Sequence, residues 1–316
     1  MKKIRTIIFV ALLIGILFGI SGVINHVYLK KSNMVTGREE NLAGLQKEED
    51  NTIDLLVLGD SESYTSISTM MLWKEDGISS YIGAQSGQQI QETYYMLKQA
   101  LQTQKPKLVM LETHVLFRDN AGMDAYRSVM EENAMYHFSV FRYHNIWKRL
   151  LSSNIGDDRQ FFKGFRVRDS VAPYDGGDYM QETTVKKQMT GFVKNYLQQI
   201  IDICKENDIP ILFYSAPSPV NYNYQKHNTL IEYTENAGIP YVDLNMMTSE
   251  LGIDWTKDTL DHGDHLNIYG AQKVTKYMRK YLEENYNLPD HRGQQKYKDW
   301  DVLEDQYEKR LLTLKV

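Results

Sequence analysis

The stretch Leu55-Leu56-Val57-Leu58-Gly59-Asp60-Ser61 decides how the chain is expected to fold. A short apolar run that ends at a glycine is typical of a buried strand, predicted here at residues 53–58, followed by a tight turn. Glycine relieves the steric demand of such a turn, and a serine there is exposed above the sheet with its N–H facing a developing oxyanion. Ser61 is therefore a candidate nucleophile, although a Gly-Asp-Ser triplet also occurs in ordinary turns.

Apolar segments of strand length recur along the chain and alternate with helical patterns. Further strands are predicted at residues 80–83, 108–111, 211–214 and 241–244. Helices are predicted at residues 68–75, 88–101, 184–207, 224–235 and 268–284. This alternation indicates an α/β fold with a parallel sheet that helices cover on both faces. Such sheets carry their sites at the carboxyl ends of the strands, where Ser61 is expected.

A second segment carries groups that could activate a serine. It reads Asp261-His262-Gly263-Asp264-His265-Leu266-Asn267, and we call residues 261–265 the histidine loop. A serine hydroxyl becomes a good nucleophile when an imidazole accepts its proton, and a carboxylate can fix the tautomer of that imidazole. His265 is therefore the candidate base, with Asp261 or Asp264 as its acid. The same loop could instead bind a metal ion or cap the next helix through Asn267.

Taken together, the two segments resemble the SGNH/GDSL hydrolase superfamily, over about residues 54–286. The resemblance implies a flavodoxin-like three-layer α/β/α sandwich with Ser61 as nucleophile and His265 as base. It also makes Gly87, in Ala84-Gln85-Ser86-Gly87-Gln88, similar to the glycine whose N–H joins that of Ser61 in the oxyanion hole. Gln88 belongs to the same substrate-binding segment.

One departure from the superfamily pattern follows the third strand. Its usual third oxyanion donor is an asparagine, whereas this chain reads Glu112-Thr113-His114. Thr113 or His114 could take over that role, or no side chain does. Glu112 stands at a strand end, where a partly desolvated carboxylate is a candidate site residue, although it could equally form a structural ion pair or a cap.

A second departure concerns the acid. The superfamily places it three residues before the histidine, and that position is His262 here, so Asp261 is preferred over Asp264. These departures, with an apolar N-terminus and a Ser-Gly-Gln second block, are similar to the surface-polymer branch. That branch includes alginate and peptidoglycan O-acetyltransferases and the D-alanyl-lipoteichoic acid biosynthesis protein, which often act with a membrane-bound O-acyltransferase. The resemblance implies acyl transfer through an acyl-serine, to water or to a polymer hydroxyl.

Composition excludes several other classes of function. A formal net charge of -5 and a pI near 5.9 argue against a nucleic-acid binder, which would show a basic face. Cys204 is the single cysteine, so the chain can form neither an internal disulfide nor a cysteine metal site. No further cluster of His, Asp or Glu in the sequence completes a coordination shell beside the histidine loop. Neither a metal nor a cofactor is therefore predicted.

The N-terminal segment predicts a membrane anchor. Residues 7–24 form a nearly unbroken apolar run of about the length that spans a bilayer. Basic residues on both sides favour a cytoplasmic N-terminus only slightly, and a cleaved signal peptide or a buried core helix are the rival interpretations. We expect a single-pass membrane protein whose catalytic domain lies outside the cytoplasm.

Composition also divides the chain into regions. The stretch at residues 117–178 interrupts the strand and helix alternation and is rich in aromatic residues, among them Tyr126 and Trp147. It is expected to be a lid, a substrate platform or a peripheral packing element. The predicted regions are an anchor at 1–30, a polar solvated stalk at 31–51, a catalytic domain at 52–288 that contains this insertion, and a polar tail at 289–316 with a terminal helix outside the core.

The sequence thus predicts an extracytoplasmic, membrane-anchored serine esterase or O-acyltransferase. Its substrate would be an acyl ester, above all an acetyl ester, of a cell-surface polymer or carbohydrate. The expected partners are that polymer, the membrane and a membrane-bound O-acyltransferase, with no nucleic acid. The alternative is a catalytically inactive domain of the same fold that binds polymer or scaffolds a membrane-bound O-acyltransferase.

Overall fold

A computed structural model describes residues 2–29, 35, 37–118, 122–146 and 162–314 of the chain. Its centre is a parallel five-stranded sheet in the order β2-β1-β3-β4-β5. The strands are β1 (Leu55–Gly59), β2 (Ser80–Ala84), β3 (Leu108–Glu112), β4 (Ile211–Ser215) and β5 (Tyr241–Asp243). This is the strand order of flavodoxin-like doubly wound sheets, so the predicted fold class and the five predicted strands are confirmed.

Helices cover both faces of the sheet, and the side chains of each strand alternate between them. In β1, Leu55 and Val57 are buried on one face, and Leu56 and Leu58 on the other. The first face is covered by α3 (Ser61–Ser66), α4 (Thr69–Asp76), α12 (Ile268–Asn285) and α13 (Lys298–Leu312), and the second by α2 (Glu40–Leu45), α5 (Ile90–Ala100) and α9 (Gly191–Glu206). Burial on both faces explains why the strands read as continuous apolar runs.

The predicted helices are present, with shifted ends. The largest shift is at α9, which is predicted from residue 184 but begins at Gly191. Thr190 caps this helix by accepting a hydrogen bond from the Val193 N–H (3.2 Å). The residues before it run along α10 (Tyr224–Ala237) instead, where the Lys187 carbonyl accepts a hydrogen bond from the Thr229 hydroxyl (2.7 Å).

Short elements complete the described part of the chain. They follow β3 and β5 and precede α13: η3 (Thr113–Leu116), η4 (Leu244–Met247), α11 (Thr248–Leu251) and η5 (Gln295–Tyr297). At the start of α12, the Asn267 side chain accepts hydrogen bonds from the N–H groups of Tyr269 (3.1 Å) and Gly270 (3.3 Å). Asn267 is therefore the helix cap that the sequence suggested.

Residues 37–45 pack against the domain instead of forming a solvated stalk. The 3₁₀ turn η2 (Gly37–Glu39) leads into α2, whose Leu42 and Leu45 are buried near Tyr81 of β2. The Tyr81 hydroxyl donates to the Asn41 carbonyl (2.8 Å), and the Asn41 amide donates to backbone oxygens of β2. The stalk prediction is wrong for these residues, because a few apolar side chains in a charged stretch suffice to dock a short helix.

The C-terminal residues also join the core. The terminal helix exists as α13, but its Trp300 and Tyr307 are 1% and 2% exposed, and the Trp300 ring lies 5.4 Å from that of Trp73 in α4. Residues seven positions apart lie on the same face of a helix. Trp300 and Tyr307 therefore share the face of α13 that packs against α4, and the acidic residues lie outside this buried face. The expectation that the helix lies outside the core is therefore wrong.

The predicted insertion at residues 117–178 divides between three places. α6 (Gly122–His137) lies against α5, and Phe162 and Phe165 are buried in the core. Farther along, residues 172–174 run beside the histidine loop, where the His262 N–H donates to the Ala172 carbonyl (2.8 Å). Trp147 falls within residues 147–161, outside the described residues.

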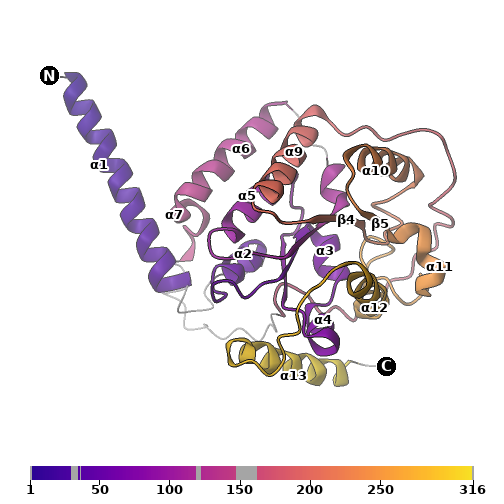
Figure 1. Cartoon of the computed structure of the whole chain (residues 1–316). Coiled ribbons are helices and arrows are strands. Elements are labelled where there is room, and N and C mark those ends of the chain that lie inside the picture. Colours follow the sequence, from indigo (N-terminus) through magenta and orange to yellow (C-terminus); the bar gives the residue numbers. More distant parts are fainter. Residues whose placement is uncertain (1, 30–34, 36, 119–121, 147–161, 315–316) are drawn as a thin grey trace.

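The N-terminal helix α1 (Lys2–Val23) continues as a π-helical turn, η1 (Ile24–Leu29), and projects from the domain (Figure 1). Lys2–Val27 is long and apolar enough to cross a membrane, by length and composition. It contacts α7 (Ser139–Arg142) and the residue before it: the Val140 N–H donates to the Ser21 hydroxyl (3.3 Å), and the Phe18 and Phe138 rings lie 4.8 Å apart. Membrane insertion and sidedness stay predictions.

Candidate active site

Ser61 is the first residue of α3, directly after the turn that ends β1. Gly59 in this turn has φ of 153°, and a Cβ on it would lie 2.0 Å from the Ser63 Oγ and 2.8 Å from the Glu112 Cβ. Glycine is therefore required by close approach. Asp60 caps α3, because its side chain accepts a hydrogen bond from the Glu62 N–H (3.1 Å). Ser61 thus stands at the carboxyl end of a central strand, as the fold predicts, and is 6% exposed.

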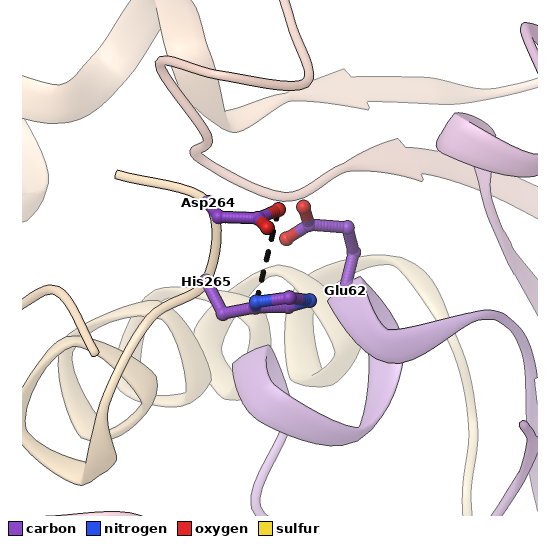
Figure 2. Close-up of side chains that lie close together, drawn as sticks. All are labelled: Glu62, Asp264 and His265. Carbon is purple, nitrogen blue, oxygen red and sulfur yellow. Dashed lines mark ion pairs between the residues drawn. The ribbon is translucent and has the colours of Figure 1, made fainter. Parts of the chain in front are cut away.

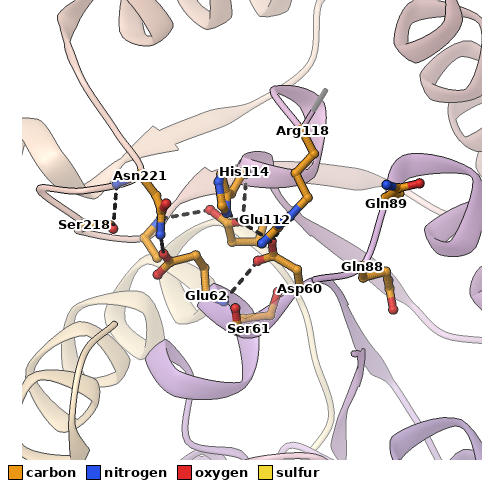
Figure 3. A network of polar contacts seen from close by, with 12 residues as sticks. Asp60, Ser61, Glu62, Gln88, Gln89, Glu112, His114, Arg118, Ser218 and Asn221 are labelled. Carbon is orange, nitrogen blue, oxygen red and sulfur yellow. Dashed lines mark hydrogen bonds and ion pairs between the residues drawn. The ribbon is translucent and has the colours of Figure 1, made fainter. Parts of the chain in front are cut away.

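Asp60 anchors the turn through a buried ion-pair network (Figure 3). Arg118 donates to its Oδ2 (2.6 Å), and the His114 Nδ1 lies 3.0 Å from the same atom. Burial raises the pKa of Asp60, but hydrogen bonding and charge from His114, with the charge of Arg118, outweigh it and lower the pKa to about 2. Asp60 is therefore a carboxylate over the ordinary pH range, next to Ser61 in the sequence. It also pairs with His114, which the sequence analysis proposed as an oxyanion donor.

Glu112 is the second buried acid at this edge of the sheet. It ends β3 and accepts hydrogen bonds from the N–H groups of His114 (2.8 Å) and Ala216 (3.3 Å). Burial raises the pKa of Glu112 to about 8, and the negative charge of Asp60 adds to the effect. At neutral pH its carboxyl group is therefore mostly protonated.

The other predicted substrate-binding residues lie after β2 and β3. Gly87 has the left-handed φ of 65° in the turn after β2. Gln88 is buried and donates from Nε2 to the Thr93 hydroxyl (3.0 Å). The Thr113 hydroxyl lies 2.5 Å from that of Ser215. Gln88 and Thr113 thus have partners of their own, and roles in substrate binding stay predictions.

The histidine loop holds the imidazole of His265 between two acids. The Nδ1 atom lies 2.7 Å from the Asp261 Oδ2 and 3.7 Å from the Asp264 Oδ1. The other Asp261 oxygen accepts a hydrogen bond from the His265 N–H (2.7 Å). Left-handed residues His262 (φ 59°) and Gly263 (φ 87°) close the turn that lets an acid four positions earlier reach the ring. A carboxylate at Nδ1 favours the tautomer that leaves Nε2 as a proton acceptor.

The histidine loop and the start of α3 meet above the sheet. Side-chain donor atoms of Glu62, Asp264 and His265 all lie within 4.8 Å of one another (Figure 2). Asn221 joins them, because its Nδ2 donates to the Glu62 Oε1 (2.6 Å) and to the Asp264 Oδ1 (2.5 Å). Within the described residues, no hydrogen bond joins the Ser61 Oγ to His265. Contacts between a nucleophile and its base often tighten only when substrate binds.

Glu62 lies deepest in this cluster and is 1% exposed. Burial raises the pKa of Glu62 well above its ordinary value, and its proximity to two further acids, Glu112 and Asp60, adds to the effect. Its Oε2 is buried and has no hydrogen-bond partner among the described residues. Burial therefore favours the protonated form of the Glu62 carboxyl group.

Three of these residues escaped sequence reasoning: Glu62, Arg118 and Asn221. Glu62 follows the candidate nucleophile directly, and that position was the only available signal for it. Arg118 and Asn221 belong to loops after β3 and β4, and they reach the site through the topology of the sheet. No local motif marks either residue.

No protein-family model and no curated protein matches the chain. Among solved structures, a candidate acylhydrolase from Bacteroides fragilis is 13% identical, with 75% of this chain and 90% of that chain covered and a TM-score of 0.38. A GDSL-like lipase from Bacteroides thetaiotaomicron is 14% identical, with 73% and 87% covered and a TM-score of 0.37. These values are too low to place the chain in a family or to assign its activity.

Proposed function

We propose that the chain is a membrane-anchored serine esterase or O-acyltransferase with Ser61 as nucleophile, His265 as base and Asp261 as its acid. The observation that carries the proposal is the 2.7 Å contact between the His265 Nδ1 and the Asp261 Oδ2, in a loop that meets the start of α3. Acyl transfer needs a serine, an imidazole and a carboxylate on the far ring nitrogen. Here the serine follows an inner strand, and the imidazole lies within 4.8 Å of the side chain of the next residue, Glu62.

The proposed reaction has two halves. The Ser61 Oγ attacks the carbonyl carbon of an acyl ester while its proton passes to the His265 Nε2. The bond from carbon to the alcohol oxygen then breaks, and His265 returns the proton to the leaving alcohol. Water or a polymer hydroxyl then attacks the carbonyl carbon of the acyl-serine and gives its proton to His265. The bond between that carbon and the Ser61 Oγ breaks, the free acid or the acylated polymer leaves, and His265 returns the proton to Ser61. The N–H groups of Ser61 and Gly87 are the proposed donors to the oxyanion.

The proposed substrate is an acyl ester, above all an acetyl ester, of a cell-surface polymer or carbohydrate outside the cytoplasm. The apolar helix Lys2–Val27 supports this location, because it could hold the domain at a membrane. The similarity of the two loops to the surface-polymer branch of the SGNH/GDSL hydrolases supports the substrate class. A membrane-bound O-acyltransferase is the proposed partner.

Hydrolysis of a chromogenic acetyl ester by the full chain in detergent tests this proposal. Wild type and the exposed-site control Ser249→Ala should release the alcohol, whereas Ser61→Ala and His265→Ala should lose nearly all of this activity. A strict transferase could be inert toward water, so the same incubations should be quenched, digested and searched for an acyl group on Ser61. A wild type with neither turnover nor acyl-serine would refute the proposal.

Non-catalytic binding or scaffolding is the second candidate function. It is favoured by the residues at the superfamily's asparagine position, because Thr113 and His114 are held by Ser215 and Asp60. Without a side-chain donor, the oxyanion hole would be weaker. This alternative predicts polymer binding that Ser61→Ala leaves unchanged, and it is excluded by a trapped acyl-serine.

A further inference from the structure

The cluster of Glu62, Asp264 and His265 offers a second use of the same histidine. We propose that these three side chains bind a divalent transition-metal ion, Zn²⁺ above all, and that the bound ion competes with Ser61 for His265. The binding site stands on the structure alone. The competition also rests on the proposed function.

The donor set suits zinc. It consists of one imidazole nitrogen and two carboxylate oxygens, from two loops, within 4.8 Å of one another. Zinc sites with an open position use three protein ligands of these types at about 2.0–2.2 Å, which places the donor atoms about 3.4 Å apart. The donor atoms therefore need to approach one another by at most about 1.4 Å to bind an ion.

Neighbouring residues already orient all three ligands. Asp261 holds the Nδ1 of His265, which leaves Nε2 for an ion. Asn221 donates to one oxygen of Glu62 and one of Asp264, which leaves the second oxygen of each. Metal-binding histidines and carboxylates are commonly hydrogen-bonded in this way on the side away from the ion.

The unpartnered oxygen of Glu62 is the independent observation that points to a ligand. Its Oε2 is buried and without a hydrogen-bond partner in the described part of the chain, and Figure 2 shows the carboxyl group facing Asp264 and His265. A buried polar atom without a partner is costly. A divalent cation at the cluster would bind Glu62 as its carboxylate, with release of the carboxyl proton to solvent, and would give this atom a partner. The side chains of Asp264 and His265 are 42% and 18% exposed, so an ion can enter from solvent.

Occupancy of this site would stop the proposed chemistry. An ion on the Nε2 of His265 uses the lone pair that would otherwise accept the proton of Ser61. The ion is not consumed, so its removal by a chelator restores the base. Zinc would therefore act as a reversible inhibitor of acylation.

Calorimetric titration of Zn²⁺ into the untagged, chelator-stripped full chain in detergent tests the site. We expect one ion per wild-type chain and at least tenfold weaker binding in Glu62→Gln and in Asp264→Asn. Glu62→Gln keeps the side-chain length and the acceptor for Asn221, and thermal unfolding checks that each variant is folded. His227→Ala is the matched control, because His227 forms another imidazole-carboxylate pair, with Asp243 (2.7 Å), away from the cluster. Unchanged affinity in both cluster variants, or its loss in the control alone, would overturn the site.

Labelling of Ser61 by a fluorophosphonate tests the competition separately. Zinc should slow the labelling of wild type, a chelator should restore it, and the labelling of Glu62→Gln should not respond at the same zinc concentration. One-to-one binding at the cluster without any effect on wild-type labelling would overturn the competition. If wild type is never labelled, the proposed function and the competition both fail, and the titration alone still decides the binding site.

Discussion

At the scale of single residues, the turn between Asp261 and His265 selects the acid. The left-handed residues His262 and Gly263 bring the Asp261 carboxylate to the ring, whereas the adjacent Asp264 stays 3.7 Å from Nδ1. Asparagine at position 261 would keep the shape but favour the wrong tautomer. We expect Asp261→Asn to slow fluorophosphonate labelling of Ser61 by roughly 10²- to 10⁴-fold, and Asp264→Asn by less than about tenfold. Labelling time courses measure both, and equal effects would show that Asp261 is not the acid.

Glu62 gives stability an expected pH dependence. Its raised folded-state pKa means that the folded chain keeps a proton that the unfolded chain releases above about 4.5. The contribution of Glu62 to the free energy of unfolding is therefore fully present below that pH, and it is lost as the pH rises toward the folded-state pKa. Glu62→Gln removes this group, so its melting temperature should decline less than that of wild type from about pH 5 to about pH 8.

Thermal unfolding across this range checks the expectation, with the exposed Glu206→Gln as control. Part of the decline should persist in every variant, because Glu112 has a pKa of about 8 for the same physical reason. Identical slopes in wild type and Glu62→Gln would show that Glu62 is ionised in the folded chain.

Site residues that belong to short sequence motifs could be predicted from the sequence. Residues that only the folded chain brings to the site could not. Ser61 and His265 each stand beside a glycine turn and an acid in a recognisable order. Arg118 and Asn221 enter the site from loops after β3 and β4, and their partners are far away in the chain. Which of Asp261 and Asp264 contacts the His265 ring depends on the backbone conformation of the turn, which the structure provides.

At the scale of elements, α2 is expected to be part of the folding unit. Its Leu42 and Leu45 are buried, and burial of such a side chain contributes about 1.5–3 kcal/mol. A fragment that begins at residue 52 should therefore have a free energy of unfolding several kcal/mol below that of a fragment that begins at residue 37. Urea unfolding of the two fragments measures the difference. Equal stability would show that α2 contributes nothing to the fold.

Strands were easier to predict than the short helices at the ends of the domain. Burial on both faces makes β1 an apolar run, which stands out in any reading of the sequence. In contrast, α2 and α13 each dock through two apolar side chains within a charged stretch. The average composition of such a stretch is polar, so it predicts a solvated segment although two of its side chains are buried. The predictions for the stalk and the tail were wrong for this reason, whereas the predicted strands were correct.

At the scale of the whole molecule, α1 is expected to place the domain outside the cytoplasm. Cys204 is buried and is the only cysteine, so a Cys204→Ala chain provides a clean background for single-cysteine labelling. Val302→Cys on α13, at a position 48% exposed, should react with an impermeant maleimide on intact cells. The background chain should stay unlabelled, and deletion of residues 2–27 should move the protein to the soluble fraction. Labelling only after permeabilisation would contradict the proposed sidedness.

The order of the parallel sheet explains why the two ends of the chain build one site. Ser61 follows β1, an inner strand of the sheet, and the histidine loop precedes α12, which packs against α3. The carboxyl ends of the strands lie on one edge, so this much could be predicted from the alternation of strands and helices. The cluster between Glu62 and His265 could not, because it depends on how two loops approach each other.

Mass-spectrometric mapping of a fluorophosphonate adduct tests the central claim most directly. The account predicts an adduct on Ser61 in wild type and in the control His262→Asn, which keeps a residue that tolerates the left-handed backbone. It predicts no adduct in Ser61→Ala and almost none in His265→Ala. Equal labelling of Ser61→Ala and wild type would contradict the account. Labelling of Ser61 in His265→Ala to the same extent as in wild type would also contradict it.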